Sequence, residues 1–166
     1  DVAIGNFDGN NGDNDIAVVN SGDSTIVILS SSSAGIRGMG NGGSIGMDIG
    51  GTTVNPGDVN NDKDLDSIIA TSRGSGQVAD VKGQTAFRDY TEIDYYDVGS
   101  EPEELLVGDL NGDGLLDIVT ADIKSMTISI LLGSGTRTWE DGISISMSPG
   151  TPRYTSLGDI DNDGDI

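Results

Sequence analysis

The chain has no cysteine and no histidine among its 166 residues. Without cysteine it can form neither disulfides nor thiolate metal sites. Without histidine it lacks the most common general base and the usual nitrogen ligand of zinc. Catalysis by an imidazole is therefore excluded, and any metal site must be built from oxygen ligands.

Basic residues are also scarce. The chain has 8 Lys and Arg and 28 Asp and Glu, which gives a formal net charge of −20. So few cations cannot neutralise phosphates, and we expect no nucleic-acid partner. No apolar run approaches the roughly 20 residues of a membrane-spanning helix, so we expect no membrane insertion. Aromatic residues make up 4% of the chain, which leaves little material for stacking on sugars.

What the chain has instead is an acidic cluster that recurs at a nearly constant step. The residue after the glycine that opens each cluster is number 6, 58, 109 or 159, so the steps are 52, 51 and 50 residues. Such a period is typical of stacked or radial arrays of one supersecondary unit. We predict repeats over 1–56, 57–107 and 108–157, with a fourth beginning over 158–166. Because the last cluster stops unfinished, we expect a piece of a longer or processed repeat protein.

Apolar segments between the clusters have the pattern of β-strands. They are rich in β-branched residues or alternate apolar with polar residues, and Gly and Pro punctuate them. No helical period is seen over any long window. The predicted strands are 2–4, 16–19 and 25–29; 67–70, 77–81 and 87–98; 105–107, 117–121, 127–132 and 143–147; and 154–157. We therefore predict an all-β fold with four short antiparallel strands in each unit of about 51 residues.

Two stretches of the sequence leave their structure open. The segment from Ser30 to Gly51 is very rich in Ser and Gly, which is compatible with a long surface loop or with a thin outer strand. Tyr90, Tyr95 and Tyr96 lie close together in the chain. Three such rings could stack on a sugar, but tyrosines of this kind more often cover the face of a strand.

The third cluster is the clearest candidate cation site. Counted from its first aspartate, oxygen-bearing side chains stand at positions 1, 3, 5 and 9, and the carbonyl at position 7 can add another oxygen. Hard oxygen ligands in a flexible loop favour calcium over zinc, copper and magnesium. The predicted ligands are Asp109, Asn111, Asp113, Leu115 through its carbonyl, and Asp117.

The other clusters repeat this pattern with differences. The second keeps the ligand set although Lys63 replaces a glycine, the first has one residue too many before Asp15, and the ninth position of the fourth lies beyond 166. The first site is therefore predicted to be weaker or rearranged. The predicted ligands are Asp58, Asn60, Asp62, the carbonyl of Asp64 and Asp66 in the second loop; Asn6, Asp8 and Asn10 with Asp13 or Asp15 in the first; and Asp159, Asp161, Asp163 and the carbonyl of Asp165 in the fourth.

An EF-hand has a similar start but a different end. It needs a bidentate Glu at position 12 and a helix on either side. Position 12 is Thr120 in the third loop and Ile69 in the second, and strand segments follow both loops. The EF-hand is therefore excluded.

The segment from Gly108 to Val119, together with 127–136 and Trp139, resembles the signature of FG-GAP/VCBS-type repeats. Integrin alpha subunits and many bacterial surface proteins contain such repeats. The resemblance covers nearly the whole chain and is weakest over 30–54. It implies β-propeller-like blades, calcium in the loop between the first two strands, and an extracellular or cell-surface location. Because propellers usually close with about 4–8 blades, three blades and the first strand of a fourth imply a partial propeller or an open array.

We therefore predict a non-catalytic, calcium-stabilised extracellular β-repeat module for adhesion or surface scaffolding, with a protein or glycan partner at the cell surface. One alternative is a protomer of an extracellular filament that forms by head-to-tail self-assembly. Another is a propeller that binds or cleaves polysaccharide. Nearly every clustered Asp already has a ligand role, which leaves no evident acid–base pair for glycoside hydrolysis, so we expect no enzyme.

Overall fold

The structure is a computed structural model that describes residues 1–7, 14–31, 37–38, 44–46, 50–59, 65, 67–83, 92–161 and 166. These residues form strands, turns and connecting segments, which confirms the predicted all-β class. No helix that could span a membrane occurs in this part of the chain.

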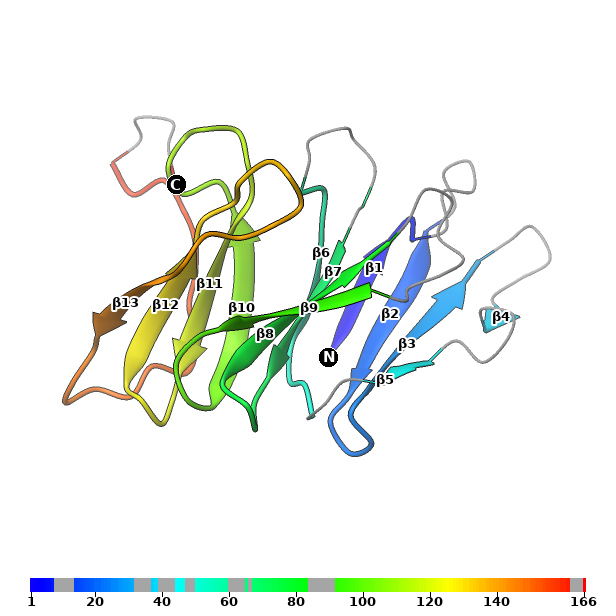
Figure 1. The fold of residues 1–166 in the computed structure, drawn as a ribbon, viewed down its shortest axis with the longest axis horizontal. Helices are drawn as coiled ribbons and strands as arrows, with labels where there is room; N and C mark the ends of the chain where they lie inside the picture. The colour runs from blue at the N-terminus through cyan, green and yellow to red at the C-terminus, as the bar shows by residue number, and fades with distance from the viewer. Residues whose placement is uncertain are drawn as a thin grey trace.

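Three antiparallel sheets follow one another along the chain (Figure 1). The first sheet contains β1 (Val2–Gly5), β2 (Asp15–Asn20), β3 (Thr25–Ser30), β4 (Arg37–Gly38) and β5 (Ser44–Gly46). The second contains β6 (Val54–Gly57), β7 (Ser67–Ser72), β8 (Gln77–Lys82) and β9 (Glu92–Asp97). The third contains β10 (Pro102–Gly108), β11 (Asp117–Asp122), β12 (Thr127–Leu131) and β13 (Ile143–Ser146).

Each sheet is a simple meander in which neighbours in sequence are neighbours in space. The strand orders are β1-β2-β3-β4, with β5 also pairing β3, then β6-β7-β8-β9 and β10-β11-β12-β13. An acidic loop joins the first two strands of every sheet. In the first and third sheets the glycine that ends the first strand pairs with the aspartate that ends the loop, Gly5 with Asp15 and Gly108 with Asp117. In the second sheet Gly57 pairs with Ser67, one residue further along the chain.

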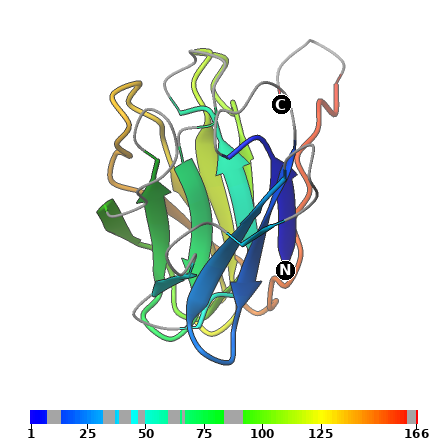
Figure 2. The same ribbon diagram turned by 90° about the vertical axis from the view of Figure 1, so that its right-hand side faces the viewer.

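The sheets stand side by side, and their first strands form the contacts between them. β6 contacts both β1 and β10. These three strands run in the same direction, so the acidic loops that follow them begin at one end of the molecule (Figures 1 and 2). This arrangement is that of propeller-like blades, and the sheets do not close into a ring within the described residues.

An apolar core fills the space between each pair of sheets. The first core joins buried Phe7 of the first acidic loop, and Ile26 and Ile28 of the first sheet, to Val54 and Val81 of the second sheet. Its partly buried members include Tyr95, whereas Tyr96 packs on the core between the second and third sheets. Both tyrosines therefore cover sheet faces, as the structural interpretation predicted, and Tyr90 lies outside the described residues.

The second core joins the second sheet to the third. It contains Ile69 and Val78 from the second sheet and Leu105, Ile118, Leu131 and Trp139 from the third, together with Val59 of the second acidic loop. The two cores make each sheet apolar on the face that meets its neighbour. The three sheets are therefore held by burial of these faces, which is the dominant favourable term in folding.

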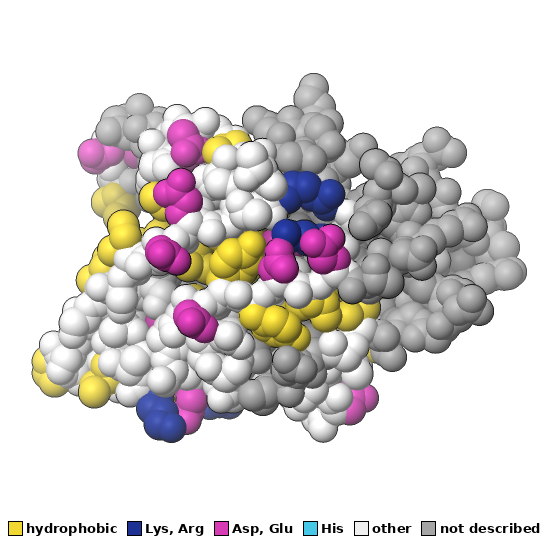
Figure 3. Space-filling view, viewed as in Figure 1, with side chains coloured by type: hydrophobic (Ala, Val, Ile, Leu, Met, Phe, Trp, Pro, Cys, Tyr) yellow, Lys and Arg dark blue, Asp and Glu magenta, His cyan; other side chains and the backbone are white. Residues whose placement is uncertain are grey.

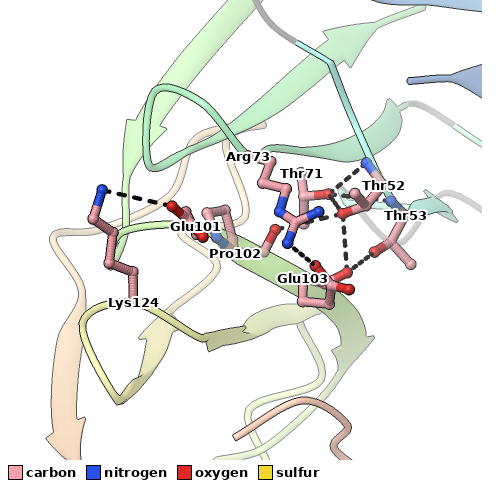
Figure 4. Close-up of polar contacts among 8 residues, drawn as sticks. All are labelled: Thr52, Thr53, Thr71, Arg73, Glu101, Pro102, Glu103 and Lys124. Atoms are coloured by element: carbon pink, nitrogen blue, oxygen red, sulfur yellow. Dashed lines mark hydrogen bonds and ion pairs between the residues drawn. The ribbon is translucent and has the colours of Figure 1, made fainter. Parts of the chain in front are cut away.

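A polar seam also joins the second sheet to the third (Figure 4). The hydroxyls of Thr52 and Thr53 each donate to the carbonyl oxygen of Glu103 at 2.9 Å, and Thr52 also bonds to the hydroxyl of Thr71. The Arg73 guanidinium lies 3.2 Å from the Glu103 carboxylate. These contacts fix the first strand of the third sheet against the turns of the second.

The structure differs from the predicted strands in two places and resolves a third that the sequence left open. β6 was not predicted, because it contains Pro56 and Gly57, which are rare inside strands. Within 30–51, the short strands β4 and β5 agree with the outer-strand alternative. Residues 154–157 form no strand ladder, and Thr155 instead donates to the Glu104 carboxylate on β10.

Candidate functional site

The third acidic loop, from Asp109 to Asp117, is described in full. The Asp109 carboxylate accepts hydrogen bonds from the backbone N–H groups of Gly112 at 2.8 Å and Gly114 at 2.8 Å. The Asn111 side-chain oxygen accepts from the N–H of Asp113 at 2.9 Å. The glycines adopt positive φ angles of 74° and 85°, which a residue with a side chain rarely adopts. The chain therefore winds back around the oxygens at positions 1 and 3.

Asp117 closes the loop from the strand side. Its side chain is fully buried, and one carboxylate oxygen accepts from the N–H of Leu110 at 2.9 Å. The other oxygen accepts from the N–H of Gly133 at 2.9 Å. The carboxylate thus ties the start of the loop to the segment that follows β12, and it satisfies two backbone donors that water cannot easily reach.

The donor chemistry of the third loop fits a hard cation. Asp109, Asn111 and Asp113 lie at the surface and supply carboxylate and amide oxygens, each of which has more than one lone pair. The oxygens that accept N–H groups can therefore also face an ion. In the described part of the chain, however, no three or more Asp, Glu, His or Cys side chains converge as a metal-binding group. Calcium at this loop remains a prediction.

The first loop keeps the closing clamp but is only partly described. Asp15 is fully buried and accepts from the N–H of Phe7 at 2.8 Å and from that of Ser31 at 2.7 Å. Of the remaining candidates, Asn6 is described, and its buried side-chain oxygen has no hydrogen-bond partner. That oxygen suits a cation. The other predicted ligands of this loop, Asp8, Asn10 and Asp13, lie outside the described residues.

The second and fourth loops are described at their beginnings. Asp58, Asp159 and Asp161 are placed at the loop starts. The residue after the first ligand differs in environment, since Val59 is 5% exposed whereas Ile160 is 99% exposed. Outside the described residues lie Asn60, Asp62, Asp64 and Asp66 of the second loop and Asp163 and Asp165 of the fourth.

Two buried carboxylates outside the loops were not predicted. Asp122 at the end of β11 is fully buried, and it accepts hydrogen bonds from the hydroxyls of Thr120 at 2.8 Å and Ser129 at 2.6 Å. Asp80 on β8 is also fully buried and accepts from the indole N–H of Trp139 at 3.0 Å. The available signal was an Asp inside a strand segment rich in apolar residues, and for Asp122 also the hydroxyl residue Thr120 two positions before it.

A charged group beside Asp80 extends this contact. Lys82 pairs with Asp94 of β9. Burial opposes its charge, but the hydrogen bond and negative charge of Asp94 outweigh burial and raise the pKa of Lys82. Burial raises the pKa of Tyr96, and the neighbouring Asp94 acts in the same direction. Lys82 therefore stays protonated and Tyr96 neutral at ordinary pH, which suits a structural cluster between sheets.

The aromatic and acidic surface gives no second site. Trp139, Tyr95 and Tyr96 pack on the two cores instead of forming a platform for sugar rings. On the face shown in Figure 3, acidic side chains are dispersed among neutral ones rather than gathered in one cleft. The acidic loops are therefore the candidate functional feature of the described structure.

Comparison with known families gives one result. Residues 58–120 and 109–166 each match the FG-GAP-like repeat. The first match runs from the second acidic loop through the third, and the second match starts at the third loop and extends to residue 166. A search of curated proteins found no match.

Proposed function

Because the chain belongs to the FG-GAP-like repeat family, we propose that it is a non-catalytic β-repeat module stabilised by calcium. Repeats of this family are generally structural modules and usually occur in extracellular proteins. We place its work outside the cell or at the cell surface, in adhesion or as a scaffold. Its partner there is a protein or a glycan.

The observation that carries this proposal is the third loop. Its side-chain oxygens at positions 1, 3 and 5 lie on a backbone that already winds around them, with Asp117 fixing both ends. Calcium takes about six to eight oxygen ligands in flexible geometry, and water completes such a shell. Asp109, Asn111, Asp113, Asp117 and the carbonyl of Leu115 would hold the ion.

Calcium would act here by neutralising charge. The chain carries a formal charge of −20, and its acidic residues are concentrated in the loops. An empty loop places like charges close together, which opposes folding, whereas a bound divalent cation reverses this repulsion. A ligand that binds only the folded state adds its binding free energy to stability. The acidic loops would thus stabilise the sheets that they connect.

The test compares thermal unfolding in calcium with unfolding in a strong chelator. At calcium 100-fold above Kd, one site adds about 2.7 kcal/mol, which raises Tm by roughly 5–10 °C in a chain of this size. Asp113→Asn removes a charge but keeps a side-chain oxygen that can accept the N–H of Leu115. This variant should lose most of the calcium-dependent rise in Tm that the third loop contributes. Asp141→Asn, at an exposed position outside the loops, is the matched control. An unchanged Tm on chelation contradicts the proposal.

Filament formation is a second candidate because both outer sheets expose apolar residues. Val2 and Ile4 on β1 are 56% and 66% exposed, and Ile143 and Ile145 on β13 are 54% and 46% exposed. A head-to-tail contact between two such faces would extend without closing. Sedimentation over a range of concentrations tests this candidate, and a monomer at all concentrations argues against it.

A further inference from the structure

A glycine ends the first strand of every sheet and lies against a side chain of the next repeat. A Cβ on Gly5 would lie 2.5 Å from Cδ1 of Leu65, and one on Gly57 would lie 3.5 Å from Cδ1 of Leu116. A Cβ on Gly108 would lie 2.9 Å from Cδ1 of Leu157, and 3.8 Å from Cδ1 of Ile166 at the corresponding place of the fourth repeat. The same kind of contact therefore occurs between successive repeats along the chain.

The apolar partner occupies one fixed place in its loop. Leu65 and Leu116 directly precede the last acidic residue of the second and third loops, Asp66 and Asp117. In the first loop, Asn14 stands at this place and is exposed. Through this leucine, the second and third loops are each linked to the repeat before them.

Leu116 reaches the core beneath the preceding loop. It packs on the cluster that joins Val59, Ile69 and Val78 of the second repeat to residues of its own repeat, and its Cδ1 lies near Gly57. Val59 follows directly after Asp58, the first candidate ligand of the second loop. Leu65 has the equivalent place on the first core, which contains Phe7. The neighbour of Leu116 in the chain is Asp117, whose carboxylate closes the third loop.

We propose that Leu116 is a latch through which cation binding in the third loop stabilises the preceding, second sheet. This inference rests on the proposed calcium binding. An ion that orders Asp109 to Asp117 also fixes Leu116, which then holds its place on the second sheet. Because coupling is reciprocal, a well-packed second sheet favours binding in the third loop. Leu116 is thus a positioning residue for the cation site.

Hydrogen exchange of the full chain, with and without calcium, tests the latch. The four proteins compared are the wild type, Asp113→Asn, Leu116→Ala and the double variant. In the wild type, calcium should slow exchange in β7 and β8. Asp113→Asn and Leu116→Ala should each reduce this calcium-dependent slowing by the same factor, about fivefold or more. The double variant should reduce it no further than either single variant does.

Leu110→Ala is the matched control. It removes the same atoms from a leucine of the same loop that is not a predicted ligand, keeps the backbone N–H that reaches Asp117, and lies outside the core on which Leu116 packs. It should leave the calcium effect on β7 and β8 intact. Additive losses in the double variant, or equal losses with Leu110→Ala, overturn the latch.

The amides of residues 112–115 separate the two proposals. If calcium shifts their NMR signals but Asp113→Asn leaves exchange in β7 and β8 unchanged, the latch is wrong and calcium binding stands. If these amides do not respond to calcium, the proposed function fails first, and the latch fails with it.

A milder pair of variants covers the case in which Leu116→Ala does not fold. Leu116→Val removes fewer atoms from the same contact, and Leu110→Val makes the same change at a leucine outside the core between the second and third sheets. Leu116→Val should weaken the calcium effect on β7 and β8, and Leu110→Val should not. An equal response in the two variants contradicts the latch.

Discussion

The first and third sheets hold their acidic loops by the same clamp although their candidate ligands differ. Asp15 and Asp117 are both fully buried, and each accepts two backbone N–H groups, one at the start of the loop and one after the third strand. The first loop has an amide at positions 1 and 5, where the third has carboxylates. The comparison shows that the aspartate that ends the loop supports the fold whether or not its loop keeps a full ligand set.

The two sheets are attached to the second sheet differently. The first sheet meets it through the core around Ile26 and Ile28 and through one hydrogen bond, from the N–H of Val54 to the Asp1 carboxylate. The third sheet meets it through a core, the threonine seam and the hydrogen bond from Trp139 to Asp80. The same repeat therefore uses apolar burial at both junctions and a larger set of directional polar bonds at the second.

The largest expected effect comes from removing the clamps. Asp117→Ala and Asp15→Ala each leave two backbone N–H groups without their acceptor, which should cost roughly 2–5 kcal/mol in chelator. Urea unfolding measures both losses. In calcium, Asp117→Ala should lower the free energy of unfolding more than Asp15→Ala does. The reason is that Asp117→Ala also removes a predicted ligand from the third loop, which has the fuller ligand set. Equal losses in calcium would mean that the third loop binds no ion through Asp117.

Trp139→Phe should have a smaller effect, confined to the junction of the second and third sheets. It keeps most of the apolar surface but removes the N–H that reaches buried Asp80, at a cost of about 1–3 kcal/mol. Hydrogen exchange should rise in β8 and β12 and stay unchanged in β1 and β2. A uniform rise across the three sheets contradicts a local role.

Asn6→Asp should make the first loop more like the third. In calcium, the carboxylate adds ligand charge, and the affinity of the first loop should rise by about tenfold. In chelator, the same change places a charge at a buried oxygen position and should lower stability. The amide signal of Phe7 during calcium titration reports the site. The prediction fails if Asn6→Asp raises stability both in calcium and in chelator, or lowers it in both.

The smallest expected effect is a dependence on alkaline pH at the second junction. The pKa values of Lys82 and Tyr96 are raised in the folded state. For both groups the folded state then holds its proton more tightly, so the stability they add is present below the unfolded pKa values near 10 and is lost as pH rises through the folded ones. Urea unfolding from pH 9 to 11 should show this loss. Lys82→Met should reduce the slope, and an unchanged slope argues against the assignment.

Most strands could be predicted because their signal is local. Segments such as 16–19 and 127–132 are β-branched and lie between turn residues, and they became β2 and β12. β6 could not be predicted in this way, since Pro56 and Gly57 weaken its local signal and its place between two other sheets defines it. The buried Asp80 and Asp122 were also missed, because a strand aspartate is usually solvated unless distant donors reach it.

The sequence alone determined the repeat, its period, the all-β class and the oxygen-only chemistry of the acidic loops, since these depend on residue types and their spacing. Only the tertiary structure decided that Asp15 and Asp117 are buried clamps and that Leu65 and Leu116 lie against the glycines of the preceding repeat. The packing of the sheets also brings the Trp139 indole to Asp80 and the Ser129 hydroxyl to Asp122. These features join atoms many residues apart, and no local pattern specifies such contacts before the sheets pack.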